Sequence, residues 1–281
     1  MLQTSLTNRP QGLRPPAQPS GGPLLVLDGV RLGYDTPHGF HLAVEDASFA
    51  VEAREKVIVI GPSGCGKSTL LKAIAGFVSP AGGRIVLDGQ SSLRPGPDRS
   101  VVFQEFDQLF PWRTILGNVA YPLRVNGWSR RDAAARARTF LELTRLGPAA
   151  DRHPHELSGG MKQRVAIARA LALDPRMLLM DEPFGALDAI TRQRLQAELN
   201  RIVAETGVTL LFVTHSIEEA LVLGDRVIVL SEPPSRVLEI VDVRTLGGPQ
   251  TAEYSAMRGR LRGLLAVDRE EGLADDGRGL D

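Results

Sequence analysis

Cysteine and net charge are both scarce in this sequence, and each shortage excludes a class of protein. Cys65 is the single cysteine among 281 residues, so no internal disulfide can form and a disulfide-stapled secreted domain is excluded. The 33 basic and 33 acidic side chains cancel, which leaves no overall positive field to attract nucleic acid or an anionic membrane surface. We therefore expect no nucleic-acid partner.

Long apolar runs, internal repeats and extended heptads are also missing. No stretch reaches the roughly 18 apolar residues that a membrane-spanning helix needs. The arginines near the N-terminus are not followed by an apolar run, so we expect no secretory signal. The chain is 43% apolar and 23% charged, which is ordinary for a globular protein. The sequence therefore predicts a cytoplasmic α/β protein of two domains, or of one domain with a substantial insertion.

Strand-like and helix-like segments alternate along most of the chain. Residues 1–22 are rich in Pro, Gly, Gln and Ser and predict a flexible extension, and residues 267–281 predict a flexible tail. The domain between them, residues 23–266, is interrupted by a helical block that we expect to be an inserted subdomain at about residues 105–160. The expected strands are 57–60, 84–89, 177–180, 208–214 and 225–230, and the expected helices are 67–77, 161–173 and 192–205.

The segment GPSGCGKST, residues 61–69, matches the phosphate-binding pattern G-x-x-x-x-G-K-[ST]. Glycines let backbone N–H groups wrap a polyphosphate, and the helix that follows directs its positive end at the same anion. Lys67 would contact the β- and γ-phosphates and Ser68 would bind Mg²⁺. The alternative is a glycine-rich turn with an accidental lysine, but the chain has only four lysines, and a strand before and a helix after favour the phosphate loop. The expected nucleotide-binding residues here are Gly61, Pro62, Ser63, Gly64, Cys65, Gly66, Lys67, Ser68 and Thr69.

The segment LLMDEP, residues 178–183, ends an apolar strand with two carboxylates. Asp181 would lie at the carboxyl edge of the sheet, where ligands of doubly wound sheets bind, and would hold Mg²⁺. Glu182 follows and is suited to polarising a water. The alternative is an acidic pair that caps the next helix. Together the two motifs define only a P-loop nucleotide-binding protein, a class that includes kinases, GTPases and motors.

The third motif, LSGGMKQR at residues 157–164, narrows the class, because with it the chain resembles the ATPase subunits of ABC transporters. The resemblance runs from about Leu24 to about Leu246 and departs from the common pattern at Ser216, where the family often has Asp. It implies the loop Ala186-Leu187-Asp188 that crosses to a partner subunit. Further implied contacts are Tyr34 on the adenine, Gln104 on Mg²⁺ and the attacking water, His215 on the γ-phosphate, and Ser158, Gly159, Gly160 and Gln163 on the nucleotide of the partner.

The resemblance also implies fold and activity. The expected fold is a P-loop NTPase core with a mostly parallel sheet, an N-terminal antiparallel β subdomain and an inserted α-helical subdomain. The expected activity is hydrolysis of ATP with Mg²⁺, with Glu182, His215, Gln104 and Lys67 as catalytic residues. Two copies would assemble head to tail on the cytoplasmic face of the membrane, as peripheral subunits on separate permease subunits.

The direction of transport is suggested by the segments LFPWRTILGNVAYPL and HSIEEALVLGDRVIVLSEPPSRV, which resemble those of nitrate-, sulfonate- and taurine-type importers. Such a system would also use a substrate-binding protein outside the membrane. Two alternatives stay open: the ATPase of an exporter or lipid-extraction system, and an ABC ATPase that works away from membranes. Phe106, Leu109, Phe110 and Trp112 either pack between subdomains or form a groove for a cytoplasmic helix of the permease, with Phe110 and Trp112 as anchors.

Cys65 lies inside the phosphate loop, at a position that the motif leaves open. One interpretation is a small filler side chain. The other is a reactive thiol whose pKa is lowered by the helix N-terminus.

Overall fold

The computed structural model describes residues 22–37, 39–91, 94–104 and 108–275, and these fall into two compact units. One unit holds the described residues of 22–104, 177–186 and 209–275; the other holds 108–176 and 187–208. The expected flexible extension lies outside the described residues except for residue 22, and so does Phe106. The tail expected at 267–281 is helical as far as residue 275, and residues 276–281 lie outside the description.

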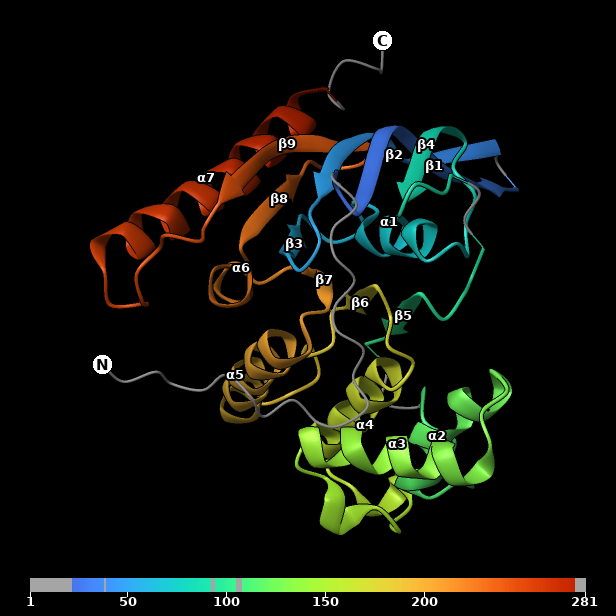
Figure 1. Cartoon of the computed structure of the whole chain (residues 1–281). Helices are drawn as coiled ribbons and strands as arrows, with labels where there is room; N and C mark the ends of the chain where they lie inside the picture. Colours follow the sequence, from blue (N-terminus) through green and yellow to red (C-terminus); the bar gives the residue numbers. More distant parts are fainter. Residues whose placement is uncertain (1–21, 38, 92–93, 105–107, 276–281) are drawn as a thin grey trace. The chain divides into compact units, whose positions relative to one another are not determined.

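The first unit is built on a nine-stranded sheet with the order β4-β1-β2-β9-β8-β3-β7-β6-β5 (Figure 1). Strands β3, β5, β6, β7 and β8 pair in parallel, and β1 pairs antiparallel with β2 and β4. Strand β9 is antiparallel to β8 and parallel to β2, so it joins the two parts into one sheet. The expected parallel core and antiparallel β region are confirmed. The strands are β1 (Leu25–Thr36), β2 (Gly39–Val51), β3 (Lys56–Ile60), β4 (Gly82–Leu87), β5 (Arg99–Val102), β6 (Met177–Asp181), β7 (Thr209–Thr214), β8 (Arg226–Leu230) and β9 (Ser235–Asp242).

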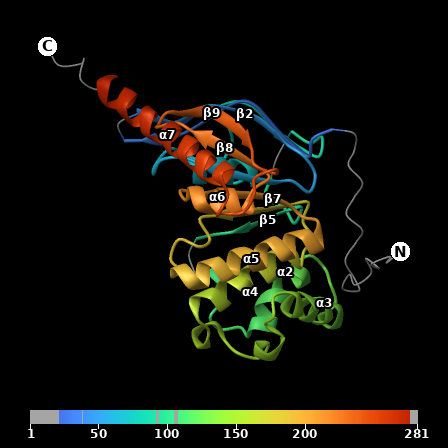
Figure 2. The ribbon, with the colours of Figure 1, turned by 90° about the vertical axis from the view of Figure 1, so that its left-hand side faces the viewer.

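The central strands are buried along nearly their whole length, as their uninterrupted apolar sequences predict. Every residue of β6 and β7 is buried, and only the first residue of β3 is partly exposed. Helix α1 (Lys67–Ile74) packs on β6 and β7, while α6 (Ile217–Leu223) packs on β3 and β7 and α7 (Ala252–Asp275) lies along β8 (Figure 2). A strand that is covered on both faces has no polar side to present, and its carboxyl end is the first place where polar side chains appear.

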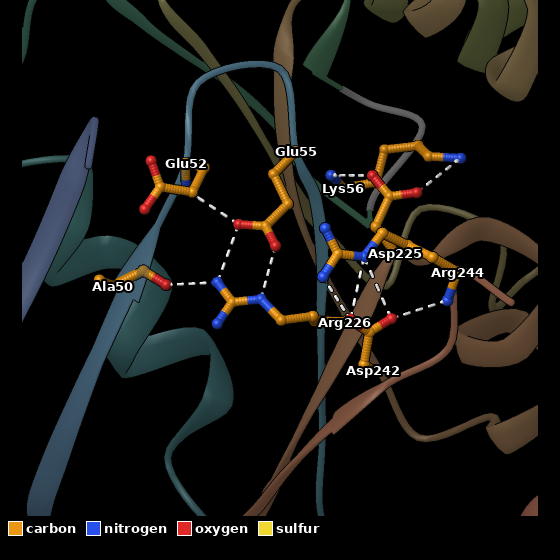
Figure 3. Close-up of polar contacts among 8 residues, drawn as sticks. All are labelled: Ala50, Glu52, Glu55, Lys56, Asp225, Arg226, Asp242 and Arg244. Atoms are coloured by element: carbon orange, nitrogen blue, oxygen red, sulfur yellow. Dashed lines mark hydrogen bonds and ion pairs between the residues drawn. The ribbon is translucent and has the colours of Figure 1, made fainter. Parts of the chain in front are cut away.

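The turn between β2 and β3 is fastened to β8 by a group of ion pairs (Figure 3). The guanidinium of Arg226 donates to both carboxylate oxygens of Glu55, at 2.5 and 2.8 Å, and to the carbonyl oxygen of Ala50 at 2.5 Å. The backbone N–H of Lys56 donates to the Asp225 carboxylate at 2.9 Å. Glu55 is buried, so these charge-assisted bonds are stronger than exposed pairs and fix where β3 begins. Strand β3 is five residues long, and the phosphate loop begins directly after its last residue, Ile60.

At the outer end of the same group, Asp242 and Arg244 form an exposed pair (Figure 3). Hydrogen bonds from Arg244 lower the pKa of Asp242 to about 2. The pair sits where β9 ends, and the backbone N–H of Val243 donates to the carbonyl oxygen of Asp225 at 2.9 Å. This bond ties the end of β9 to the start of β8.

The second unit is helical. It contains α2 (Ile115–Val125), α3 (Arg130–Leu143), α4 (Gly159–Leu171), α5 (Ala189–Thr206) and the 3₁₀ turns η2 (Gly147–Ala149) and η3 (Pro154–Glu156). Polar N-caps begin the helices: Thr114, Ser129, Ser158 and Asp188 each accept a backbone N–H from the first turn. The Ser129 hydroxyl accepts the backbone N–H of Asp132 at 3.1 Å and donates to the Asp132 carboxylate at 2.7 Å. The unit extends beyond the expected range of about 105–160, because α5 packs against α4.

In the described part of the chain, none of the helices combines the length and the hydropathy that crossing a bilayer requires.

Candidate functional site

The phosphate-binding pattern forms the loop between β3 and α1. Gly64 and Gly66 have φ values of +84° and +90°, which side chains with a Cβ rarely adopt. A Cβ on Gly66 would also lie 2.8 Å from Cγ2 of Val44. Gly66 is the N-cap of α1 and has no side chain to bind the first backbone N–H groups of the helix. The loop therefore leaves these donors to an anion, which is what a polyphosphate site requires.

Lys67 is held at the start of α1 with its ammonium group turned back over the loop. It is 5% exposed, and its Nζ donates to the carbonyl oxygens of Gly61 at 2.9 Å and Pro62 at 2.7 Å. The ammonium group has three donors and carries a positive charge. This charge lies at the same loop whose backbone N–H groups are available to an anion. Both features favour a multiply charged anion.

Ser68 and Asp181 meet although 113 residues separate them. The Ser68 hydroxyl donates to Oδ1 of Asp181 at 2.9 Å, and the carboxylate ends β6. Burial raises the pKa of Asp181, while the hydrogen bond from Ser68 opposes the rise. A hydroxyl and a carboxylate are the oxygen ligands that Mg²⁺ prefers when phosphates and water complete its shell. Among the described residues there is no cluster of three or more His, Cys, Asp or Glu suited to a metal ion, so a divalent cation here would depend on such additional ligands.

Glu182 and His215 form the third pair of the site. His215 Nδ1 lies 2.9 Å from Oε2 of Glu182. Glu182 follows β6 and His215 follows β7, and the two strands are neighbours. Glu182 has a φ of +42°, a conformation that costs on the order of 1 kcal/mol for a residue with a Cβ, and its N–H donates to Val213 O at 2.9 Å. The backbone is thus bent to set this carboxylate at the edge of the sheet.

Gln104 and Tyr34 are both exposed in the sheet unit. A Cβ built on Gly185 would lie 3.3 Å from Nε2 of Gln104, so this amide lies beside the turn that follows Glu182. In the described residues no hydrogen bond joins Gln104 to Ser68 or Asp181. Tyr34, on β1, is 53% exposed, and its ring packs against His41 with 5.1 Å between centroids.

The Ser-Gly-Gly motif begins α4 in the helical unit. Ser158 is the N-cap and accepts the N–H of Met161 at 3.4 Å. Gly160 allows a close approach of α5, since a Cβ there would lie 2.8 Å from Cγ2 of Thr191. Gln163, expected to contact a nucleotide, is 0% exposed, and its amide atoms have no hydrogen-bond partner. In this structure it faces the interior of the unit rather than the surface that Ser158 occupies.

The thiol of Cys65 is fully buried, and burial raises its pKa. The hypothesis of a reactive thiol with a lowered pKa is therefore wrong, because desolvation outweighs the favourable charge of Lys67. The filler interpretation fits the structure.

Sequence reasoning missed Thr214 and Glu219, whose hydrogen bond holds the loop that carries His215. The hydroxyl of Thr214 donates to Glu219 at 2.5 Å and accepts the N–H of Ser216 at 3.0 Å. Ser216 in turn caps α6 through the N–H of Glu219 at 3.2 Å. The spacing Ser-x-x-Glu at Ser216 is a capping-box signal that could have identified this support. Ser216, which stands where the family often has Asp, thus has a structural role as the N-cap of α6.

Replacing Asp181 by asparagine is expected to raise the thermal stability of the chain. Because the pKa of Asp181 is raised, ionising it lowers the free energy of unfolding at neutral pH, and this loss vanishes as the pH falls below the unfolded value of 3.8. Thermal unfolding over a pH series should give a higher melting temperature for Asp181→Asn, with the difference shrinking toward acid. Asp188→Asn is the control: its pKa is lowered by the Thr191 N–H, so no increase is expected. A lower melting temperature for Asp181→Asn at pH 7 would contradict the assignment.

These features define a P-loop ATPase: a glycine-rich phosphate loop at the end of a parallel strand, a Ser–Asp pair for a cation and a Glu–His pair beside it. The ABC transporter family matches residues 44–185, and the chain belongs to this family. The chain is 48% identical over 236 residues to the taurine import ATP-binding protein TauB of Rhizobium johnstonii, which covers 79% of this chain and 88% of TauB. It is 45% identical over 257 residues to the nitrate import ATP-binding protein NrtC of Synechococcus elongatus, covering 87% of this chain.

The chain spans only 38% of the length of NrtC. Among solved structures, the dimeric post-hydrolysis state of the ATP-binding cassette MJ0796 with ADP and Pi matches with a TM-score of 0.69 and 32% identity. This match covers 79% of the present chain and all of the other. The chain is accordingly an ATPase of the ABC type.

Proposed function

We propose that this chain is the ATP-hydrolysing subunit of an ABC importer for a small anion of the nitrate, sulfonate or taurine kind. The Glu182–His215 contact at 2.9 Å, beside the Ser68–Asp181 pair, is the observation that carries the hydrolytic part. The import function and the type of substrate are supported by the names of the relatives, NrtC and TauB.

The proposed hydrolysis assigns one task to each polar group. Lys67 Nζ and the N–H groups at the start of α1 bind the β- and γ-phosphates. Glu182 Oε2 accepts a proton from water as the water oxygen bonds to the γ-phosphorus and the bond to the bridging oxygen breaks, which yields ADP and phosphate. His215 orients the Glu182 carboxylate and donates toward the γ-phosphate. Mg²⁺, held by Ser68, Asp181 and in the proposal Gln104, would neutralise charge on the phosphate oxygens.

The second half of the site comes, in this proposal, from another copy of the chain. Ser158, Gly159 and Gly160 begin α4, and the positive end of a helix suits an anion. Each copy has one phosphate loop and one such turn, so two copies arranged head to tail would form two complete sites. The relative MJ0796 has been solved as a dimer, which supports this arrangement. Tyr34 would stack on the adenine from its exposed position on β1.

The proposed permease contact centres on Phe110 and Trp112. Trp112 is 71% exposed, and Phe110 packs between it and Tyr121, with centroid distances of 5.5 and 4.8 Å. Buried Asn118 accepts the Phe110 N–H at 2.8 Å and donates to the Phe110 carbonyl at 3.1 Å, so the loop is rigid. Leu109 is buried, so it is not part of the exposed anchor. A rigid, exposed aromatic anchor suits an incoming helix.

Trp112→Ala is expected to release the permease while leaving ATP binding intact, because Trp112 belongs to the helical unit and the phosphate loop belongs to the other unit. The Glu182→Gln chain would be tagged, expressed in its native host, extracted in mild detergent and its co-purifying proteins identified. A polytopic permease should co-purify, and Trp112→Ala should remove it. Trp128→Ala is the matched control, because Trp128 is also exposed and lies beyond the other end of α2.

The same experiment separates the alternatives. A permease accompanied by a substrate-binding protein supports import and identifies the substrate, whereas a permease without one favours an exporter or a lipid-extraction system. Recovery of only soluble partners would contradict the transport proposal and the peripheral location on the cytoplasmic face, and would favour an ABC ATPase that works away from membranes.

A further inference from the structure

A cavity of about 540 Å³ lies within the helical unit, between α4, α5 and the segment that follows α3. This volume is in the range of small-molecule sites, roughly 300–1,000 Å³. Its charged lining is one-sided: four arginines face a single glutamate. The lining residues that matter are Arg145, Arg164, Arg194, Arg201, Glu198 and, at one end, Ser158.

Two of these arginines have no partner of their own. In the described part of the chain, the side chains of Arg145 and Arg194 make no hydrogen bond or ion pair, and both residues are exposed. Arg145 also has a φ of +55°, a left-handed conformation that a side chain with a Cβ adopts at some cost. Two unpaired guanidinium groups at one cavity are therefore available to a ligand.

The other two arginines are fixed by the wall of the cavity. Arg164 donates to the carbonyl oxygen of Thr144 at 3.3 Å. Arg201 donates to that of Leu143 at 2.5 Å and forms an ion pair with Glu205 at 2.7 Å. Glu198 lies 3.9 Å from both guanidinium groups, too far for a hydrogen bond. Nε of Arg201 and Oε1 of Glu198 are buried and have no hydrogen-bond partner. Glu205 thus compensates Arg201, and Glu198 offsets part of the remaining positive charge without saturating the donors.

We propose that this cavity binds a small molecule that carries at least two oxyanion groups, such as phosphates or sulfonates. The planar guanidinium fork matches the oxygens of such groups in bidentate pairs, and a multiply charged ligand relieves the repulsion among four clustered arginines. The site goes beyond the proposed ATP chemistry. It shares Ser158 and Gly160 with the surface assigned to the partner's nucleotide, but the arginines are not part of that assignment.

Inorganic pyrophosphate is the probe, measured by calorimetric titration of the full-length chain without metal ions. The chain carries Lys67→Ala, which weakens phosphate binding at the loop, so that the effect of the cavity arginines can be measured separately. We expect saturable binding that weakens by about tenfold or more in Arg145→Gln/Arg194→Gln, because each change removes a charge-assisted contact. Neither side chain has a partner to lose, so folding should be unaffected, as the melting temperature would verify.

The matched control is Arg130→Gln/Arg138→Gln, which removes the same charge from two exposed arginines of α3 that do not line the cavity. Pyrophosphate binding should be unchanged in this variant. In the chain that keeps the cavity arginines, sulfate, a single oxyanion, should bind much more weakly than pyrophosphate. Absence of saturable binding, or equal losses in the two double variants, would overturn the site and indicate general surface attraction. Neither result bears on hydrolysis, since the titration requires no ATP turnover and no dimer.

Discussion

Glu182→Gln is expected to lower the rate of ATP hydrolysis by about 100- to 10,000-fold, the usual contribution of a general base. The amide keeps the shape of the side chain and can still bond to His215 across the 2.9 Å contact, but it cannot accept a proton from water. Binding of ATP should persist, because Lys67 and the loop N–H groups belong to a different segment. Phosphate release at saturating Mg²⁺ and ATP measures the effect.

The same variant should accumulate as an ATP-bound dimer that elutes earlier in size-exclusion chromatography than the nucleotide-free chain. Glu253→Gln, an exposed change on α7, is the control and should retain wild-type turnover. Normal turnover in Glu182→Gln would remove Glu182 from the mechanism. Loss of turnover without an ATP-dependent dimer would support Glu182 as the general base but contradict the head-to-tail assembly.

Lys67→Ala is expected to weaken ATP binding by about 10- to 100-fold, the value of a hydrogen bond to a charged group. The change should also lower the melting temperature of the free chain, because it leaves the carbonyl oxygens of Gly61 and Pro62 without their donor. Titration with ATP and thermal unfolding give the two readouts.

Lys72→Ala supplies the control for both readouts, since Lys72 is an exposed residue in the last turn of the same helix. It removes an equal charge from α1 and should change neither ATP binding nor stability appreciably. Equal losses of ATP affinity in the two variants would mean that the general charge of α1, and not the Lys67 contact, holds the phosphates.

Residues 61–69 and 178–183 could be recognised from the sequence because their chemistry is local. The loop needs glycines at fixed spacing, and an apolar run that ends in Asp181 and Glu182 marks the carboxyl edge of a buried strand. The same local signals predicted β3, β6, β7 and α4 to within a few residues. The resemblance added Tyr34, Gln104 and His215, whose local sequence carries no comparable pattern.

Pairing between distant segments was decided only by the tertiary structure. Glu182 meets His215 because β6 lies beside β7, and no pattern in either strand specifies its neighbour. Strand β9 pairs with the preceding strand β8 and also with β2, almost 200 residues earlier, and local periodicity cannot predict this second pairing. The pKa of Cys65 and the burial of Gln163 depend on surrounding atoms from many segments, so the motif position alone led to the wrong expectation for Cys65. Local chemistry thus identifies the residues that are proposed to bind phosphate, while long-range packing sets their contacts, solvation and charge.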